Sequence, residues 1–303
     1  EPVHEVLKDF SADGLRLYYS HIGSPFTDVE WDIEKAAVYR DHVERFYNVI
    51  MEIITIKGTT EKMIDRWLLS KLHRSIKEYN GAMEVFDLRK AVDLALFELL
   101  KDIQWYQARG GDNGKVVGEF VKAWLRMLTP FIPHVCEELW WFVEKGLVST
   151  QLLPKVDEGK IDDKVEVAED SLLNVSNDIK KVLKLTKIKP KKITIFVAPE
   201  WKRIIYGEAA RIKNPSEIIK TFMKYEEINE VGKEAVDFVN YLGKHSSNLS
   251  EKVLETGEEI SYLKDSTDFL KQNFKAEIAI ENSDDSDNPK ARNNLGLFKK
   301  NKI

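Results

Sequence analysis

The sequence predicts a mainly α-helical protein of more than one domain, in which an antiparallel helical bundle precedes a small α+β domain. Two observations predict this fold class. Apolar residues recur at intervals of three and four through residues 31–149, as they do along one face of successive helices. Beyond residue 170 the helical pattern alternates with two short β-branched runs, 193–198 and 276–281, which are typical of strands.

The predicted bundle has five helices joined by short connections, which favours an antiparallel arrangement. We expect the first, third and fourth helices over 31–56, 85–106 and 116–128. The second helix is expected to begin after Thr59 or Thr60 as its N-cap. The fifth is expected to follow the prolines Pro130 and Pro133 and to end by Gly146. In the stretch Leu128–Trp140 the two prolines interrupt an amphipathic pattern that then resumes, so we expect a helix, a kink and a second helix.

The second half of the chain begins after a charged, turn-forming stretch, 150–170, which we predict to be a linker. Further helices are expected over 172–185, 199–211, 215–225, 229–245 and 256–274, and an aperiodic tail from Asn282. The predicted parts are therefore 1–30, a bundle over 31–149, the linker 150–170 and an α+β domain over 171–303.

Composition limits the class of protein. A chain of 303 residues with 43% hydrophobic content can bury full cores, and its length suggests two domains. The net charge of -5 gives no overall positive field, so a nucleic-acid site must be a local patch. The single cysteine, Cys136, excludes an intrachain disulfide, and we expect it to be buried and inert in a reducing cytosol.

The sequence has no apolar run of about 20 residues and no signal-peptide pattern, so we expect a soluble, cytoplasmic chain. Its start at Glu1-Pro2 suggests a cut fragment.

A basic stripe is predicted on the second helix. Lys62, Arg66, His73 and Lys77 share a narrow angular sector on the outer side, opposite the apolar face of the helix. Cations on a rigid helix can neutralise successive phosphates without reading sequence. An ordinary solvated face is the alternative.

Lysines crowd the junction between the predicted helix 172–185 and the following strand. They are Lys180, Lys181, Lys184, Lys187, Lys189, Lys191 and Lys192, with no carboxylate among them. Such a cluster is easier to explain with a polyanion nearby, although part of it would suit the negative end of a helix dipole. The segment is a second candidate RNA site.

Two weaker candidates follow. Trp201, with Lys202 beside it, could stack on an unpaired base or pack in a core. The tail carries Lys290, Arg292, Lys299 and Lys300, which could become ordered on RNA or merely aid solubility.

Several segments together resemble the archaeal and eukaryotic type of leucyl-tRNA synthetase, a class I enzyme whose helical bundle is its anticodon-binding domain. They are Val6–Leu17, Phe26–Asp32, Asp65–Leu68, Gln104–Tyr106, the Pro130–Trp140 run, Asn177–Lys180 and Val197–Lys202. The proline run is shared with isoleucyl, valyl and methionyl relatives, so the last two segments decide for the leucyl type. Coverage is nearly the whole chain.

The resemblance implies a C-terminal fragment that lacks most of the catalytic domain. The full-length enzyme would use ATP and Mg²⁺ to attach leucine to tRNA, whereas this fragment would bind tRNA, as a monomer, without activating leucine. The C-terminal domain would contact the long variable arm of leucine tRNA. The tail departs from the family pattern, since Asn288–Ile303 has one proline and ends basic, which makes contacts by Leu297, Phe298 or Ile303 doubtful. No DNA or membrane partner is expected.

No catalytic centre is predicted in the chain. His21-Ile-Gly-Ser24 is similar to the nucleotide-binding motif of class I synthetases, but Ser24 replaces the second histidine and too little chain is present for a catalytic domain, so we expect a turn there. No phosphate loop, nucleophile elbow or metal-ligand spacing occurs. Two alternatives stay open, namely an isoleucyl or valyl fragment and a protein-interaction module that docks through Trp140 and Trp141.

Overall fold

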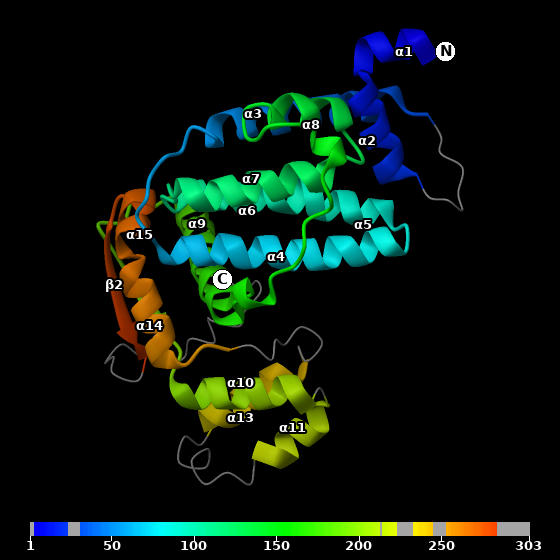
Figure 1. Ribbon diagram of the computed structural model, residues 1–303. Coiled ribbons are helices and arrows are strands. Elements are labelled where there is room, and N and C mark those ends of the chain that lie inside the picture. Colours follow the sequence, from blue (N-terminus) through cyan, green and yellow to red (C-terminus); the bar gives the residue numbers. More distant parts are fainter. Residues whose placement is uncertain (1–2, 24–30, 213, 223–232, 245–252, 284–303) are drawn as a thin grey trace. The chain divides into compact units, whose positions relative to one another are not determined.

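The computed structural model describes residues 3–23, 31–212, 214–222, 233–244 and 253–283 (Figure 1). Contacts divide the chain into two compact units, Glu1–Asp162 and Asp163–Ile303. The predicted class, a helical bundle followed by a small α+β domain, is confirmed by the element order. The finer four-part division stays a prediction. No helix in the described ranges is long and apolar enough to cross a membrane.

The first unit is built from helices, with aromatic side chains at its centre. Phe46 and Phe120 both pack edge-on against the fully buried Trp124. Its elements are α1 (Val3–Phe10), α2 (Ala12–Ile22), α3 (Ile33–Ile53), α4 (Met63–Glu84), α5 (Leu88–Val92), the π-helical η1 (Asp93–Glu98), α6 (Leu99–Ala108), α7 (Gly114–Leu128), α8 (Pro133–Trp140) and the short η2 (Val148–Thr150) and η3 (Glu158–Lys160). The prediction of one regular helix over 85–106 is therefore wrong, because a π-helical segment interrupts it.

The start of α4 also differs from the prediction. Neither Thr59 nor Thr60 is the N-cap, because the chain before α4 stays extended against the loop that precedes α7. Gly58 accepts a hydrogen bond from the Gly114 nitrogen at 2.8 Å, and a Cβ on Gly58 would lie 2.3 Å from a backbone oxygen of that loop. The helix begins instead where the buried Asp65 accepts a hydrogen bond from the Lys62 nitrogen.

The proline run forms a break of four residues between two separate helices rather than a kink. The buried Asp13 of α2 accepts a hydrogen bond from the Val135 nitrogen at 2.8 Å and caps the first turn of α8. Arg16, also on α2, donates to the carbonyl oxygens of Pro130 at 2.8 Å and Phe131 at 3.3 Å. Direct contacts thus hold the segment near residue 13 against the proline run, which lies more than a hundred positions later in the chain.

The second unit contains two apolar cores around a two-stranded parallel sheet. Its elements are α9 (Asp163–Thr186), β1 (Lys192–Val197), α10 (Glu200–Ile212), α11 (Pro215–Phe222), α13 (Lys233–Lys244), α14 (Thr256–Asp265), α15 (Thr267–Phe274) and β2 (Glu277–Asn282). In the sheet, Lys192 lies opposite Glu277. One core joins α10, α11 and α13 around Phe238, and the other joins α9, the sheet, α14 and α15 around Leu172.

Two predicted boundaries in this unit are wrong. Helix α9 begins at Asp163, nine positions before the predicted start, inside the expected linker. Its first half is helical because Val165, Ala168 and Leu172 are buried on one face. The predicted helix 256–274 is two helices, which meet at the buried Ser266.

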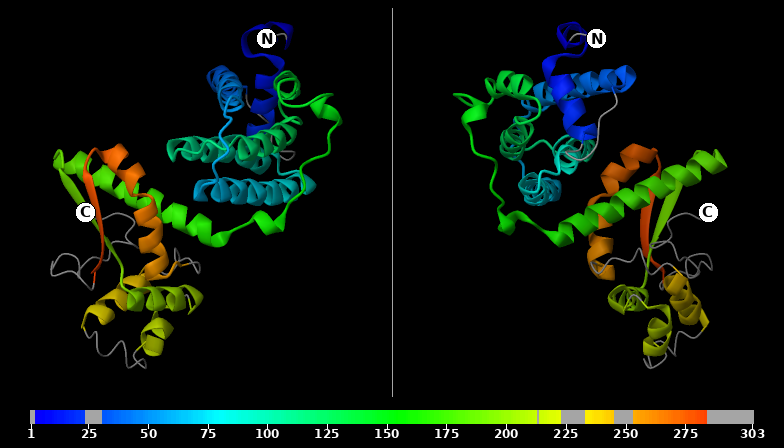
Figure 2. Two further views of the ribbon diagram at one scale, coloured as in Figure 1. Left: turned by 60° about the vertical axis from the view of Figure 1, so that its left-hand side comes forward. Right: turned by 90° about the vertical axis from the view of Figure 1, so that its right-hand side faces the viewer.

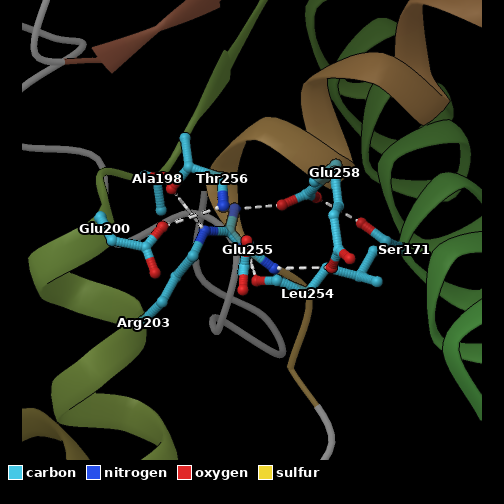
Figure 3. Close-up of polar contacts among 9 residues, drawn as sticks. Ser171, Ala198, Glu200, Arg203, Leu254, Glu255, Thr256 and Glu258 are labelled. Atoms are coloured by element: carbon cyan, nitrogen blue, oxygen red, sulfur yellow. Dashed lines mark hydrogen bonds and ion pairs between the residues drawn. The ribbon is translucent and has the colours of Figure 1, made fainter.

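A buried polar network connects the elements around these cores (Figure 3). The Arg203 guanidinium of α10 forms an ion pair with Glu259 of α14, and both side chains are almost completely buried. Arg203 also donates to the Leu254 carbonyl at 2.8 Å and to the Thr256 hydroxyl at 2.9 Å, while Ser171 of α9 donates to Glu259. Arg203 and Glu259 both have hydrogen-bonding partners, and these contacts offset the free-energy cost of removing the two charges from water.

Candidate nucleic-acid interface

The predicted lysine cluster lies where α9 ends and the chain turns into β1 (Figure 2). All seven lysines are exposed. Lys187 terminates the helix in the left-handed conformation, with φ 54, and its nitrogen donates to the Leu183 carbonyl at 2.9 Å. Glycine or asparagine usually occupies this cap position. The turn thus holds a lysine at a position that glycine fills with less strain.

Most of the cluster is not neutralised by carboxylates. Lys181 forms an ion pair with Asp178 at 3.3 Å. In the part of the chain that the structure describes, the other six lysines form no ion pair, namely Lys180, Lys184, Lys187, Lys189, Lys191 and Lys192. The C-terminal dipole of α9 favours cations by only about 0.3–1 kcal/mol each. The α9–β1 corner is therefore a local positive patch on a chain of net charge -5.

Apolar side chains are interleaved with these lysines. Val182, Leu185 and Ile188 are 44%, 63% and 62% exposed. Periodicity did not reveal this exposure, because the same spacing on the first half of α9 belongs to a buried face.

The predicted stripe on α4 has a different environment. Lys62 pairs with Asp112 at 2.9 Å, Arg66 with Asp162 at 2.5 Å and Lys77 with Glu158 at 2.8 Å. Two of these carboxylates come from residues 154–162, the strap, which follows η2 and runs along α4 (Figure 1). The cations of the stripe are thus locally neutralised.

His73 does not lie on an outward face, so that part of the stripe prediction is wrong. It is 5% exposed, because the strap covers it. Its Nδ1 accepts a hydrogen bond from the Asp157 nitrogen at 3.1 Å, and its Nε2 therefore carries the proton and donates to Glu119 at 3.1 Å. Lys160 of the strap reaches the same carboxylate at 2.5 Å. The hydrogen bond from His73, followed by that from Lys160, lowers the pKa of Glu119 to about 2.

Trp201 and Lys202 are positioned by the core of the second unit. The Trp201 ring packs edge-on against Phe238, with centroids 5.9 Å apart. The Lys202 side chain is 3% exposed and pairs with Glu234 at 2.8 Å. The structure therefore places Lys202 away from any surface that RNA could reach. The predicted tail residues Lys290, Arg292, Lys299 and Lys300 lie outside the described residues.

The residues considered for chemistry have structural surroundings. His21 lies in the last turn of α2 rather than in the expected turn, between the Tyr39 hydroxyl at 2.5 Å and Asp93 at 2.9 Å. Cys136 is buried as predicted, and burial raises the pKa of its thiol well above the usual value. Among the described residues, no group of three or more His, Cys, Asp or Glu could hold a metal ion.

Comparison with known proteins finds relatives of this chain. Residues 65–195 match the anticodon-binding domain of tRNA ligase. Over 298 residues, 95% of the chain, it is 35% identical to the leucine–tRNA ligase of Methanocaldococcus jannaschii. Over 243 residues, 80% of the chain, it is 33% identical to that of Archaeoglobus fulgidus. This chain is homologous to the archaeal leucine–tRNA ligases.

The match to leucine–tRNA ligases is partial in length. The chain spans 30% of the M. jannaschii protein and 26% of the A. fulgidus protein. One solved structure is a ternary complex of Agrobacterium radiobacter K84 LeuRS with tRNA and LeuAMS. Its LeuRS chain is 21% identical to this chain. The match covers 54% of this chain and 22% of the LeuRS chain, with a TM-score of 0.46.

The resemblance drawn from the sequence is thereby confirmed. These matches to leucine–tRNA ligases do not favour an isoleucyl or valyl fragment, nor a protein-interaction module. The two tryptophans expected to dock a partner protein also differ in exposure. Trp140 is buried, at 3% exposed, and only Trp141, at 81%, faces solvent.

Proposed function

We propose that this chain is the tRNA-binding C-terminal portion of a leucine–tRNA ligase. The full-length protein would attach leucine to leucine tRNA with ATP and Mg²⁺, and this portion, as a monomer, would hold the tRNA without contributing a catalytic residue. The observation that carries the proposal is the α9–β1 corner, where six exposed lysines form no ion pair within the described ranges.

Lysines in this arrangement suit a phosphate backbone. Each ammonium group that meets a phosphate releases counterions, so affinity rises with the number of contacts and falls with salt. Phosphate contacts position an RNA but carry no base sequence. We therefore assign to the corner the recognition of RNA shape, and we propose the long variable arm of leucine tRNA as the part that it contacts.

The test is binding of the purified chain to three RNAs at two salt concentrations. The RNAs are leucine tRNA, a copy without the long variable arm, and isoleucine tRNA. The proposal expects tighter binding to intact leucine tRNA and a steep loss of affinity with salt. Equal affinity for all three RNAs would remove the variable arm from the proposal, and absence of binding at low salt would overturn it.

A further inference from the structure

Two cations of the α4 stripe are neutralised without being covered. The Arg66 side chain remains 62% exposed although it pairs with Asp162, and the Lys77 side chain remains 59% exposed although it pairs with Glu158. Both carboxylates belong to the strap. Lys62 and His73 differ, because Lys62 also binds the Gly110 carbonyl and His73 is buried.

The strap is held on α4 by contacts that do not involve these two carboxylates. Asn80 donates to the Pro154 carbonyl at 3.2 Å. The Asp157 nitrogen donates to His73, and the Asp162 nitrogen donates at 2.8 Å to the hydroxyl of Ser70, a residue with no exposed surface. Removal of the Glu158 and Asp162 charges therefore leaves the strap docked.

We propose that Arg66 and Lys77 form a second phosphate-binding line, at which Glu158 and Asp162 occupy the places of RNA phosphates until an RNA backbone replaces them. The inference rests on the proposed function, because it requires that the chain binds RNA. It assigns to the strap a new role, which is to weaken RNA binding by the first unit.

Energetics favour such an exchange. The Lys77–Glu158 pair joins two exposed side chains, and in the other pair Arg66 is 62% and Asp162 25% exposed. Ion pairs at a protein surface contribute about 0–1 kcal/mol each, so their loss costs little. A phosphate offers Arg66 a charge-assisted, bidentate partner. The two cations lie eleven positions apart on one helix, which corresponds to about 16 Å along its axis, so a single RNA strand can reach both.

The experiment removes the strap charges with Glu158→Gln and Asp162→Asn and measures leucine tRNA binding over a range of salt. We expect about tenfold tighter binding at low salt and a log–log salt slope steeper by about two, one for each cation that now releases its own counterion. Adding Arg66→Gln and Lys77→Gln to the same chain should abolish this gain. Thermal unfolding of the strap variant should stay close to that of the unchanged chain.

The matched control is Glu61→Gln with Glu84→Gln. Both residues are exposed, Glu61 just before α4 and Glu84 at its last position. They form no ion pair among the residues described, and their replacement gives the same change in net charge. An unchanged slope in the strap variant, or an equal gain in the control, would overturn the inference while the proposed function stands. Failure of the unchanged chain to bind RNA would overturn both, and this outcome is visible before any variant is made.

Discussion

The α4 stripe and the α9–β1 corner look alike in sequence and differ in structure. Both gather cations on or beside one helix. On α4, Lys62, Arg66 and Lys77 meet carboxylates 50, 96 and 81 positions away in the chain. At the corner, most lysines meet none in the described part of the second unit. The difference teaches that a cluster of cations becomes available positive charge only where the fold brings no carboxylates to it.

The largest expected effect is on tRNA affinity, and it tests whether the α9–β1 corner, unlike the α4 stripe, supplies available positive charge. Replacing Lys187, Lys189, Lys191 and Lys192 with Gln should weaken binding of leucine tRNA by roughly 100-fold at low salt and lower the salt slope by about four. The control replaces four other exposed lysines of the same unit, Lys220, Lys264, Lys271 and Lys275. Equal losses in the two variants would mean that only net charge matters and would break the comparison.

The next effect concerns stability rather than RNA. His73→Ala should lower the free energy of unfolding of the first unit by about 1–3 kcal/mol, because the Asp157 nitrogen loses its acceptor and Glu119 loses a donor. Urea unfolding measures this change, and tRNA affinity should not fall. Lys90→Ala on the same unit is the control, since its pair with Glu78 is exposed and long, at 3.8 Å. A loss of tRNA affinity in His73→Ala would return this histidine to the RNA site.

A smaller, pH-dependent effect follows from the same contact. The pKa of Glu119 is about 2 in the folded state against an ordinary 4.5, so the folded state holds its proton less tightly than the unfolded state. The stabilisation is present above about pH 4.5 and is lost as the pH falls toward 2. Glu119→Gln should therefore flatten the acid dependence of stability in this window, modestly because the side chain is 37% exposed. An identical pH profile in both proteins would argue against the contact.

The smallest effect isolates one lysine. Lys187→Gly should stabilise the second unit by about 0.5–1 kcal/mol, because glycine adopts the left-handed conformation without a Cβ penalty. The same change should lower the salt slope of tRNA binding by about one. Lys189→Gly removes an equal charge without the left-handed backbone and should give no stabilisation. Thermal unfolding with tRNA titration would check both, and unaltered tRNA binding in Lys187→Gly would exclude this side chain from the interface.

Much of the fold was predictable because its causes are local. The period of three and four gave α3 and α7 to within a few residues, and β-branching gave both strands. Other features were not predictable, among them the early start of α9, the π-helical insertion after Val92 and the break at Ser266. Each depends on which residues meet a neighbouring element, and periodicity contains no such information.

The sequence by itself determined the helical bundle, the small α+β unit, the relationship to leucine–tRNA ligases and the position of every cation along the chain. Tertiary structure alone decided which cations remain available, since Asp112, Glu158 and Asp162 reach the stripe only after folding. It also decided that Lys202 is buried while Leu185 is exposed. The physical reason is that helix formation follows the pattern of neighbouring residues, whereas burial and charge neutralisation depend on groups that are distant in sequence and close in space.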